Sequence, residues 1–539
     1  MAGLATAVEI MPANASILDR KMKKTSARVS TAVVLLALLG GLGFIGFHIS
    51  QDMGNIALGS IWPYLLLALA LLIALGFEFV NGFHDTANAV ATVIYTHSLD
   101  PNIAVVWSGL CNLAGVLASS GTVAFAVVTL LPVELILQVS SGAGFAMVFA
   151  LLIAAIVWNL STWWFGLPAS SSHTMVGSII GVGVANQLLN VHSGTSGLDW
   201  EQAFKVLKVL LISPVLGFGA AALLMLLSKR LLKYPALYEA PKGKQPPPWP
   251  IRALMVLTCT GVSFFHGSND GQKGMGLIML ILIGTVPTAY ALNHAVTASD
   301  IQDFIAASEQ AGHILDRYVD KNATLGSDPR AEVTDYNRTK QLQPDTILAL
   351  RELVEDLNHE VALYKVFKSV PAQDQTNVRN DMYVAGEAIR LMQKNNNPAF
   401  TPGENAALAN YKSKVDKATR FIPDWVKVAV ALALGLGTMV GWKRVVVTVG
   451  EKIGKDHLTY AQGAAAGLVA MGTIFAADNF GLPVSTTHIL SSGVAGTMTA
   501  NGSGLRMSTV RNILAGWFLT LPAAALLSGL LFWLFRSIS

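Results

Sequence analysis

The sequence predicts an all-α polytopic membrane protein with two inverted-topology repeats, broken helices or re-entrant elements, and an inserted soluble helical domain. Three observations lead to this fold class. Hydrophobic residues make up 53% of the 539 positions and charged residues only 13%, well below the quarter that is typical of soluble domains. Two polar motifs each occur twice within apolar surroundings, and a long polar stretch separates the two motifs of the second half. The chain is therefore expected to cross a lipid bilayer many times, as two related halves.

Apolar runs of about 20 residues, long enough to cross a bilayer as a helix, recur along the chain, and we expect about eleven membrane segments. Among these runs are Ile61–Val80, Phe145–Phe165, Val206–Leu227 and Ile513–Phe535. The net charge of +4 lies mostly in loops, where it indicates topology rather than binding to nucleic acid. Cys111 and Cys259 lie in apolar runs without the spacing of metal ligands. We expect two reduced packing residues, no metal and no cofactor.

The N-terminal 28 residues form a polar tail with several cations, followed by the apolar run Val29–Ile49. A signal peptide has the same order of charges, but this run is about 20 residues long and has no small-residue cleavage site. We therefore expect a cytoplasmic tail at 1–28 and an extra, uncleaved membrane anchor at 29–49.

The remainder is expected to contain five parts. They are repeat 1 at 61–228, a linker at 229–250, the first part of repeat 2 at 251–292, a soluble helical insert at 293–424 and the second part of repeat 2 at 425–539. The linker is rich in Pro and Lys, so it cannot form a helix and is expected to be cytoplasmic.

The insert follows from the spacing of the repeated motifs. Asp85 and His173 are 88 residues apart, whereas Asp270 and His488 are 218 apart, and the excess of 130 residues matches the polar stretch at 293–424. Cations in the linker and at Lys443 mark the cytoplasmic side, so the insert is expected in the periplasm. The two copies then cross the membrane in opposite directions, an arrangement that supports alternating access in secondary transporters.

The first repeated motif reads FGLPASSSH at 165–173 and FGLPVSTTH at 480–488. Gly and Pro break a helix, and Pro suits the first position of a new one. The following turn presents backbone N–H groups, hydroxyls and the positive end of a helix dipole, which together favour an anion. Helix capping and packing of small residues is the structural alternative. Two copies in matching surroundings favour an anion site shared between the halves.

The expected donors to that anion are the hydroxyl groups of the two copies. These are Ser170, Ser171 and Ser172 of the first copy and Ser485, Thr486 and Thr487 of the second. His173 and His488 end the copies, and three roles stay open for them: contact with the anion, proton relay, or a hydrogen bond to a backbone carbonyl.

The second repeated motif places a carboxylate in each half. Asp85 and Asp270 lie within membrane segments, where a carboxylate costs at least about 2.5 kcal/mol and usually lines a functional cavity. If the helix continues, Asn88 shares a face with Asp85, and the two oxygens can coordinate Na⁺. Lys273 takes the corresponding place after Asp270, as a tethered positive charge or a structural ion-pair partner. Glu78 is a further candidate for proton coupling.

These paired motifs resemble those of the Pit inorganic phosphate transporters, most of all the bacterial low-affinity permeases. The similar strings are Asn81–Ile94, Phe165–Thr174, His266–Gly276 and Gly481–Ser491. The resemblance extends from about residue 61 to the C-terminus and weakens across the insert.

The resemblance implies a transporter rather than an enzyme, in the inner membrane of a bacterium. It implies phosphate binding by the Ser and Thr residues of both re-entrant elements, and Na⁺ binding by Asp and Asn in sodium-coupled members. Two positions depart from the pattern: His84 replaces an Asn, and Lys273 replaces the second cation-site Asn. The latter fits the proton-coupled branch, which also carries soluble metal–phosphate complexes.

We therefore expect phosphate import by proton symport through alternating access. The expected partners are inorganic phosphate, protons, a divalent metal–phosphate complex and the lipid bilayer, with a homodimer left open. Alternatives are a sodium-coupled phosphate symporter and a sulfate permease of the same superfamily; sulfate has no proton to share with carboxylates. A more remote alternative is an intramembrane hydrolase that uses Ser172, His173 and Asp85 as a triad.

Overall fold

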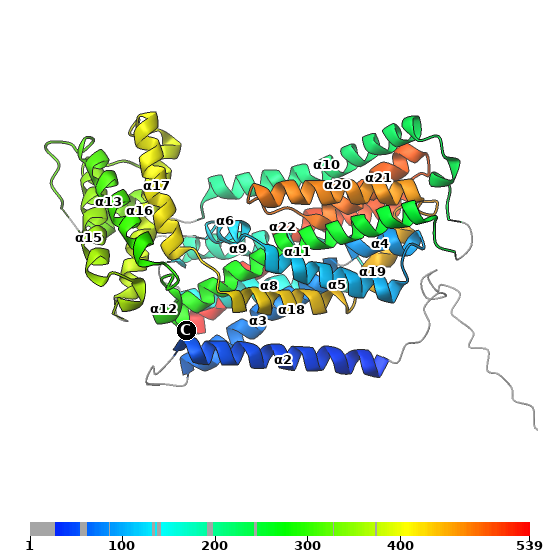
Figure 1. Cartoon of the computed structure of the whole chain (residues 1–539), viewed down its shortest axis with the longest axis horizontal. Coiled ribbons are helices and arrows are strands. Elements are labelled where there is room, and N and C mark those ends of the chain that lie inside the picture. The colour runs from blue at the N-terminus through cyan, green and yellow to red at the C-terminus, as the bar shows by residue number, and fades with distance from the viewer. Residues whose placement is uncertain are drawn as a thin grey trace, which may run out of the picture.

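The computed structural model describes residues 27–53, 62–85, 87–131, 135–136, 142–190, 198–241, 245–326, 328–371 and 374–538. These residues form a long bundle of apolar helices with a smaller group of helices at one end (Figure 1). Within the described ranges the regular structure is helical, with one isolated β-bridge between Gly454 and Leu505. The predicted all-α class is confirmed. The expected N-terminal tail lies outside the described residues.

The helices of the first half precede the linker. They are α2 (Ala27–Met53), α3 (Trp62–Asp85), α4 (Ala87–Tyr95), α5 (Pro101–Ala118), α6 (Thr122–Val128), α8 (Gly142–Trp164), α9 (Ser171–Leu189) and α10 (Trp200–Leu231). The helices of the second half that belong to the bundle are α11 (Trp249–Thr285), α12 (Pro287–Tyr290), α18 (Asp424–Thr438), α19 (Lys443–Val447), α20 (Tyr460–Asn479), α21 (Thr486–Asn501) and α22 (Met507–Ile538). In the described part of the segment between α10 and α11, the regular structure is one short 3-10 turn, Pro235–Leu237.

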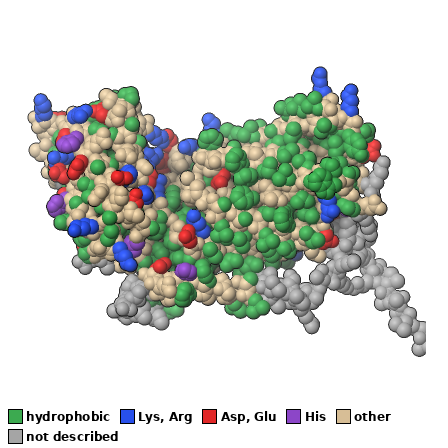
Figure 2. Space-filling model, viewed as in Figure 1, with side chains coloured by type: hydrophobic (Ala, Val, Ile, Leu, Met, Phe, Trp, Pro, Cys, Tyr) green, Lys and Arg blue, Asp and Glu red, His purple; other side chains and the backbone are tan. Residues whose placement is uncertain are grey.

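The smaller group consists of α13 (Ala298–Asp316), α14 (Pro329–Thr339), α15 (Thr346–Tyr364), α16 (Gln375–Asn395) and α17 (Pro402–Thr419). These helices enclose an apolar core of their own. Charged side chains gather on this group, whereas the visible face of the bundle is largely hydrophobic (Figure 2). The group is joined to the start of α10 by ion pairs, among them Lys340–Asp199 at 3.3 Å and Lys394–Glu201.

Six helices among the described residues are long and apolar enough to cross a membrane, or seven if one bent pair forms a single span. This is fewer than the eleven segments expected from the sequence. Part of the difference has a physical cause: α18 and α21 are only 15 and 16 residues long, too short to span about 30 Å of hydrocarbon alone. Both helices bury most of their side chains, which shows that other parts of the protein surround them.

The two segments that carry the repeated Asp motif run in opposite directions. Glu78 of α3 lies against Gly274 of α11, and further along, Arg252 Nε at the start of α11 donates to Ser98 O beyond α4 at 2.9 Å. The helix α11 continues without a break through the second copy of the motif. The expectation of an interrupted helix is therefore wrong for the second copy.

The repeated glycines allow this packing. A Cβ atom on Gly82 would lie 2.2 Å from Leu434 O of α18, and one on Gly267 would lie 2.1 Å from Asn112 O of α5. Small residues let membrane helices approach backbone to backbone. The two Gly positions thus hold the two Asp-bearing segments against equivalent neighbours.

We expect Gly267→Ala to destabilise the bundle, because the new methyl group must displace backbone atoms of α5. Overpacking of this kind costs about 1–3 kcal/mol. Gly472→Ala in α20 is the control, since nothing lies within 4 Å of its Cβ position and Ala is the better helix former. Thermal unfolding of the detergent-purified proteins measures the effect. Equal melting temperatures for the two variants would contradict the close-packing role.

Candidate functional site

The two Gly-Leu-Pro loops have the same local geometry. Gly166 and Gly481 adopt left-handed φ angles of +66° and +62°, which Gly adopts without steric cost. Ser170 then caps α9 by accepting from His173 N at 3.2 Å, and Ser485 caps α21 by accepting from His488 N at 3.1 Å. The prediction that Pro starts each helix was wrong, because α9 and α21 begin at Ser171 and Thr486, three residues after the prolines. Ser170 and Ser485 use their hydroxyls as caps.

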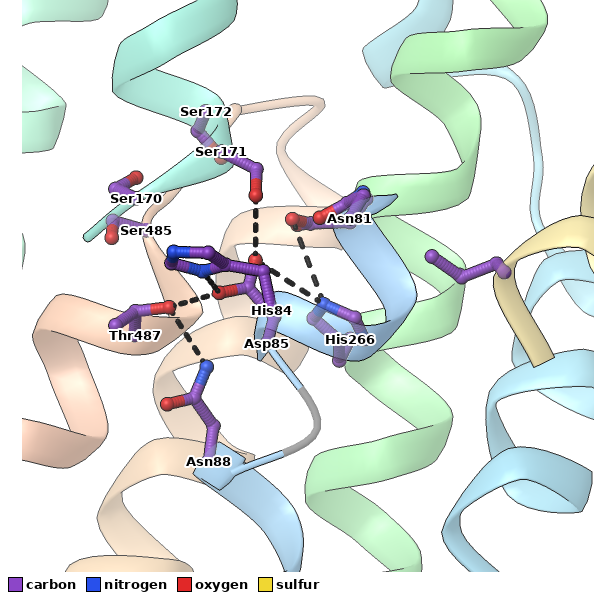
Figure 3. Close-up of polar contacts among 12 residues, drawn as sticks. Asn81, His84, Asp85, Asn88, Ser170, Ser171, Ser172, His266, Ser485 and Thr487 are labelled. Carbon is purple, nitrogen blue, oxygen red and sulfur yellow. Dashed lines mark hydrogen bonds and ion pairs between the residues drawn. The ribbon is translucent and has the colours of Figure 1, made fainter. Parts of the chain in front are cut away.

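Hydroxyls from both loops meet at the carboxylate of Asp85, which is buried at the end of α3 (Figure 3). Ser171 Oγ donates to Oδ2 at 3.1 Å, and Thr487 Oγ1 donates to Oδ1. Asn88 Nδ2 donates to Thr487 Oγ1 at 2.8 Å, while its own Oδ1 has no hydrogen-bond partner among the described residues. Asp85 and Asn88 therefore both reach Thr487. This arrangement brings residues 402 positions apart into one contact.

The second carboxylate forms a buried ion pair. Lys273 Nζ lies 2.6 Å from Asp270 Oδ1 and donates to Ser172 Oγ at 2.5 Å. Ser172 in turn donates to Val484 O at 2.8 Å, and Lys273 Nζ lies 3.4 Å from the same carbonyl. The ammonium group therefore connects α11 to the loops of both copies.

His266 lies between the two carboxylates, and sequence reasoning missed it. Its Nε2 is 3.8 Å from Asp85 Oδ2 and 3.7 Å from Asp270 Oδ2, while Nδ1 lies 2.7 Å from Asn112 Oδ1. One atom from each of the three residues lies within 4.8 Å of the others, close enough to hold a cation. The available signal was the repeat itself, since His266 precedes Gly267 as Asn81 precedes Gly82.

The paired histidines pack against each other beside this centre. The rings of His173 and His488 are 4.3 Å apart, and His488 stacks on Trp517 at 4.0 Å. His173 Nδ1 and His488 Nε2 have no hydrogen-bond partner among the described residues, and neither has Thr486 Oγ1. Both rings line a largely apolar cavity of about 550 Å³ between α10, α21 and α22.

Glu78 lies two turns before Asp85 on α3, fully buried. Asn81 Nδ2 donates to its Oε2 at 3.4 Å, and its Oε1 has no partner among the described residues. It faces the backbone of α11 next to Lys273, because a Cβ on Gly274 would meet its carboxyl group. Of the carboxyl groups of Glu78, Asp85 and Asp270, only that of Asp270 forms an ion pair with the Lys273 ammonium group among the described residues. Buried charge of one sign requires protons or cations for balance.

The geometry excludes the hydrolase alternative. Ser172 donates to Val484 O rather than to a histidine, His173 Nδ1 has no partner in the described part of the chain, and Asp85 accepts from Ser171. A nucleophile and its base must lie within hydrogen-bond reach. The three residues do not form a relay.

The chain is similar in sequence to known proteins. Residues 81–528 match the phosphate transporter family. The chain belongs to that family. It is 42% identical over 493 residues to the low-affinity inorganic phosphate transporter PitA of Escherichia coli K12, covering 87% of this chain and 96% of the relative. It is 26% identical to a probable low-affinity inorganic phosphate transporter of Bacillus subtilis, over 88% and 99% of the two chains. A solved structure titled "The sodium-dependent phosphate transporter" matches with 19% identity and a TM-score of 0.47, over 88% of this chain and 100% of that one.

Family membership assigns this chain a transport role and not an enzymatic one. It also agrees with the helices that can cross a membrane, and supports the predicted location as a multi-pass protein of the bacterial inner membrane. The resemblance inferred from the paired motifs is confirmed.

Proposed function

We propose that this protein imports inorganic phosphate by symport with protons, through alternating access around the Asp85 centre. One observation carries the proposal: Ser171 of the first loop and Thr487 of the second donate to the same buried carboxylate. A site made from both halves opens to one side or the other when the halves move relative to each other. The antiparallel course of the two Asp-bearing segments supports such a movement.

The residues around the centre suit a protonated oxyanion. Lys273 supplies a positive charge, and the hydroxyls of Ser171, Ser172, Thr486 and Thr487 supply donors. Phosphate near neutral pH also carries its own O–H groups, which can donate to Asp85 when phosphate displaces the protein hydroxyls. Sulfate has no such donor and would be repelled by the carboxylate, so phosphate is the better fit.

Protons are the favoured coupling ion because a tethered cation already accompanies Asp270. Lys273 Nζ lies 2.6 Å from the carboxylate, where a sodium-coupled member would hold Na⁺ between Asp and Asn. Asp85, His266 and Asp270 nevertheless offer oxygen and nitrogen ligands within 4.8 Å of one another. They would suit the metal of a neutral metal–phosphate complex carried as substrate. Sodium coupling through Asp85 and Asn88 remains the second candidate.

Both loops should be required for phosphate transport. Replacing Ser171 and Ser172 by Ala, or Thr486 and Thr487 by Val, removes two donors, and each hydrogen bond to a charged group is worth about 1.5–3 kcal/mol. Either double variant should therefore slow exchange of labelled phosphate across proteoliposomes at least about tenfold. Thr499→Val, which removes an exposed hydroxyl of the same α21 helix, is the control. Normal exchange by either well-folded double variant would exclude a shared site.

A further inference from the structure

The insert and the bundle enclose a cavity of about 530 Å³ that no part of the central site uses. Its wall on the insert side includes Arg390 of α16 and Arg420, directly after α17, and Lys205 lies on its α10 wall. Its opposite wall includes residues 480–483, the loop that leads into α21. Asp199 and Asp416 also line it, so three cations and two carboxylates face a space that is large enough for a phosphate ion.

A buried guanidinium without a counter-ion among the described residues lines a second cavity, which shares Arg420 with this space. Arg379 of α16 is 5% exposed, and its Nη1 donates to Asn380 Oδ1 at 3.0 Å. Its Nε has no hydrogen-bond partner among the described residues, and no carboxylate is among the groups that act on its charge. Burial and the nearby Arg420 lower the pKa of Arg379 to about 10, so it keeps its charge at neutral pH. An unpaired buried charge is costly and requires an anion or water.

Arg379 and Arg420 belong to one connected surface. A smaller cavity of about 30 Å³ is lined by Arg379 and Arg420, and Arg420, Phe125 and Thr129 also line the larger cavity. Arg420 and Arg390 already have carboxylate partners, Asp416 at 3.1 Å and Glu387 at 2.5 Å. Arg379 and Lys205 form no ion pair with a carboxylate among the described residues, so their charges are left to attract a mobile anion.

The loop at 480–483 separates this cavity from the central site. Leu482 lines the cavity, yet its carbonyl accepts from Asn269 Nδ2 of α11 at 3.1 Å. Two residues after Leu482, the carbonyl oxygen of Val484 accepts a hydrogen bond from Ser172 Oγ. An anion in the cavity is thus one loop away from the hydroxyls that meet at Asp85.

We propose that the insert forms an entry vestibule in which a phosphate ion binds to Arg420, attracted also by the neighbouring charge of Arg379, before it passes the 480–483 loop to the central site. This inference rests on the proposed function, and on the expectation that the insert faces the periplasm. Arginine pairs with phosphate oxygens through two N–H groups at once. The alternative is that Arg379 only packs on Tyr383, whose ring lies 5.3 Å from the guanidinium carbon.

The test is phosphate uptake by right-side-out vesicles that contain Arg379→Gln, Arg420→Gln or Arg351→Gln. Arg351 is the control, because it is an insert arginine paired with Asp316 and Glu355 outside this cavity. Losing one charged contact should raise the KM for phosphate about tenfold or more in the first two variants, with the maximal rate retained. The KM of Arg351→Gln should equal that of the wild type. In inside-out vesicles, where phosphate arrives from the other face, all variants should have the wild-type KM.

Two results would overturn the vestibule. One is an unchanged KM in right-side-out vesicles for both cavity variants, and the other is an equal increase of KM from both faces. Arg379→Lys keeps the charge if the Gln variant does not fold, and should recover part of the affinity. Failure of the proposed function looks different, since wild-type vesicles would then take up no phosphate at all.

Discussion

Replacing Lys273 by Met is expected to abolish phosphate uptake. The ammonium group lies 2.6 Å from Asp270 and bonds Ser172 at 2.5 Å, so its loss leaves a buried carboxylate without its partner. Breaking such a pair costs about 3–5 kcal/mol, which corresponds to more than a hundredfold in an equilibrium constant. Uptake of labelled phosphate into proteoliposomes, normalised to folded protein, measures the effect.

The double variant Asp270→Asn/Lys273→Met separates function from structure. Removing both charges restores neutrality, so the melting temperature should recover towards that of the wild type. Uptake should stay abolished if the pair takes part in transport. Recovery of uptake together with stability would show that Lys273 is only a structural ion-pair partner. Lys273→Asn tests the coupling ion, because an Asp/Asn pair at this place should confer partial dependence on Na⁺.

Asp85→Asn should end accumulation of phosphate against its gradient, even where some exchange persists. The amide keeps the shape of the carboxylate, but it carries no titratable charge and offers only one acceptor to Ser171 and Thr487. Weakening one hydrogen bond to a charged group lowers the binding constant at least about tenfold. The coupling proton also loses the carboxylate that binds it. The measurement is the steady-state ratio of internal to external phosphate under an imposed pH gradient.

Asp478→Asn is the matched control for Asp85→Asn. Asp478 also accepts two hydrogen bonds, from Ser268 Oγ at 2.6 Å and Gln272 Nε2 at 2.9 Å, but it does not contact the Asp85 centre. It should therefore keep accumulation close to that of the wild type. If Asp85→Asn still concentrates phosphate with the wild-type dependence on pH, Asp85 has a structural role only.

The sequence contained enough to predict the all-helical class and the loops that precede α9 and α21, because these depend on local composition and turn residues. It could not show that Ser171 and Thr487 share one carboxylate. That contact joins residues 402 positions apart and depends on how the two halves pack. The continuity of α11 was also hidden, since Gly267 and Gly271 look like helix breakers. In the structure each faces a close neighbour on α5, so small size is what the positions require.

The position of His266 also could not be predicted from the sequence. A single His before a Gly is a weak signal, and only the fold places it between two carboxylates from different halves. The partition of the chain into repeats, linker and insert stays a prediction. The roles of the site residues also stay predictions, which the transport measurements test.

Proton-coupled phosphate transport is tested most directly by uptake of labelled phosphate into proteoliposomes that contain the wild-type protein. The same pH gradient and the same membrane potential are imposed with either choline or Na⁺ as the external cation. We expect uptake that requires the pH gradient and has the same rate in both cations. Uptake that falls sharply when choline replaces Na⁺, or that ignores the pH gradient, would contradict proton symport and favour a sodium site at Asp85 and Asn88.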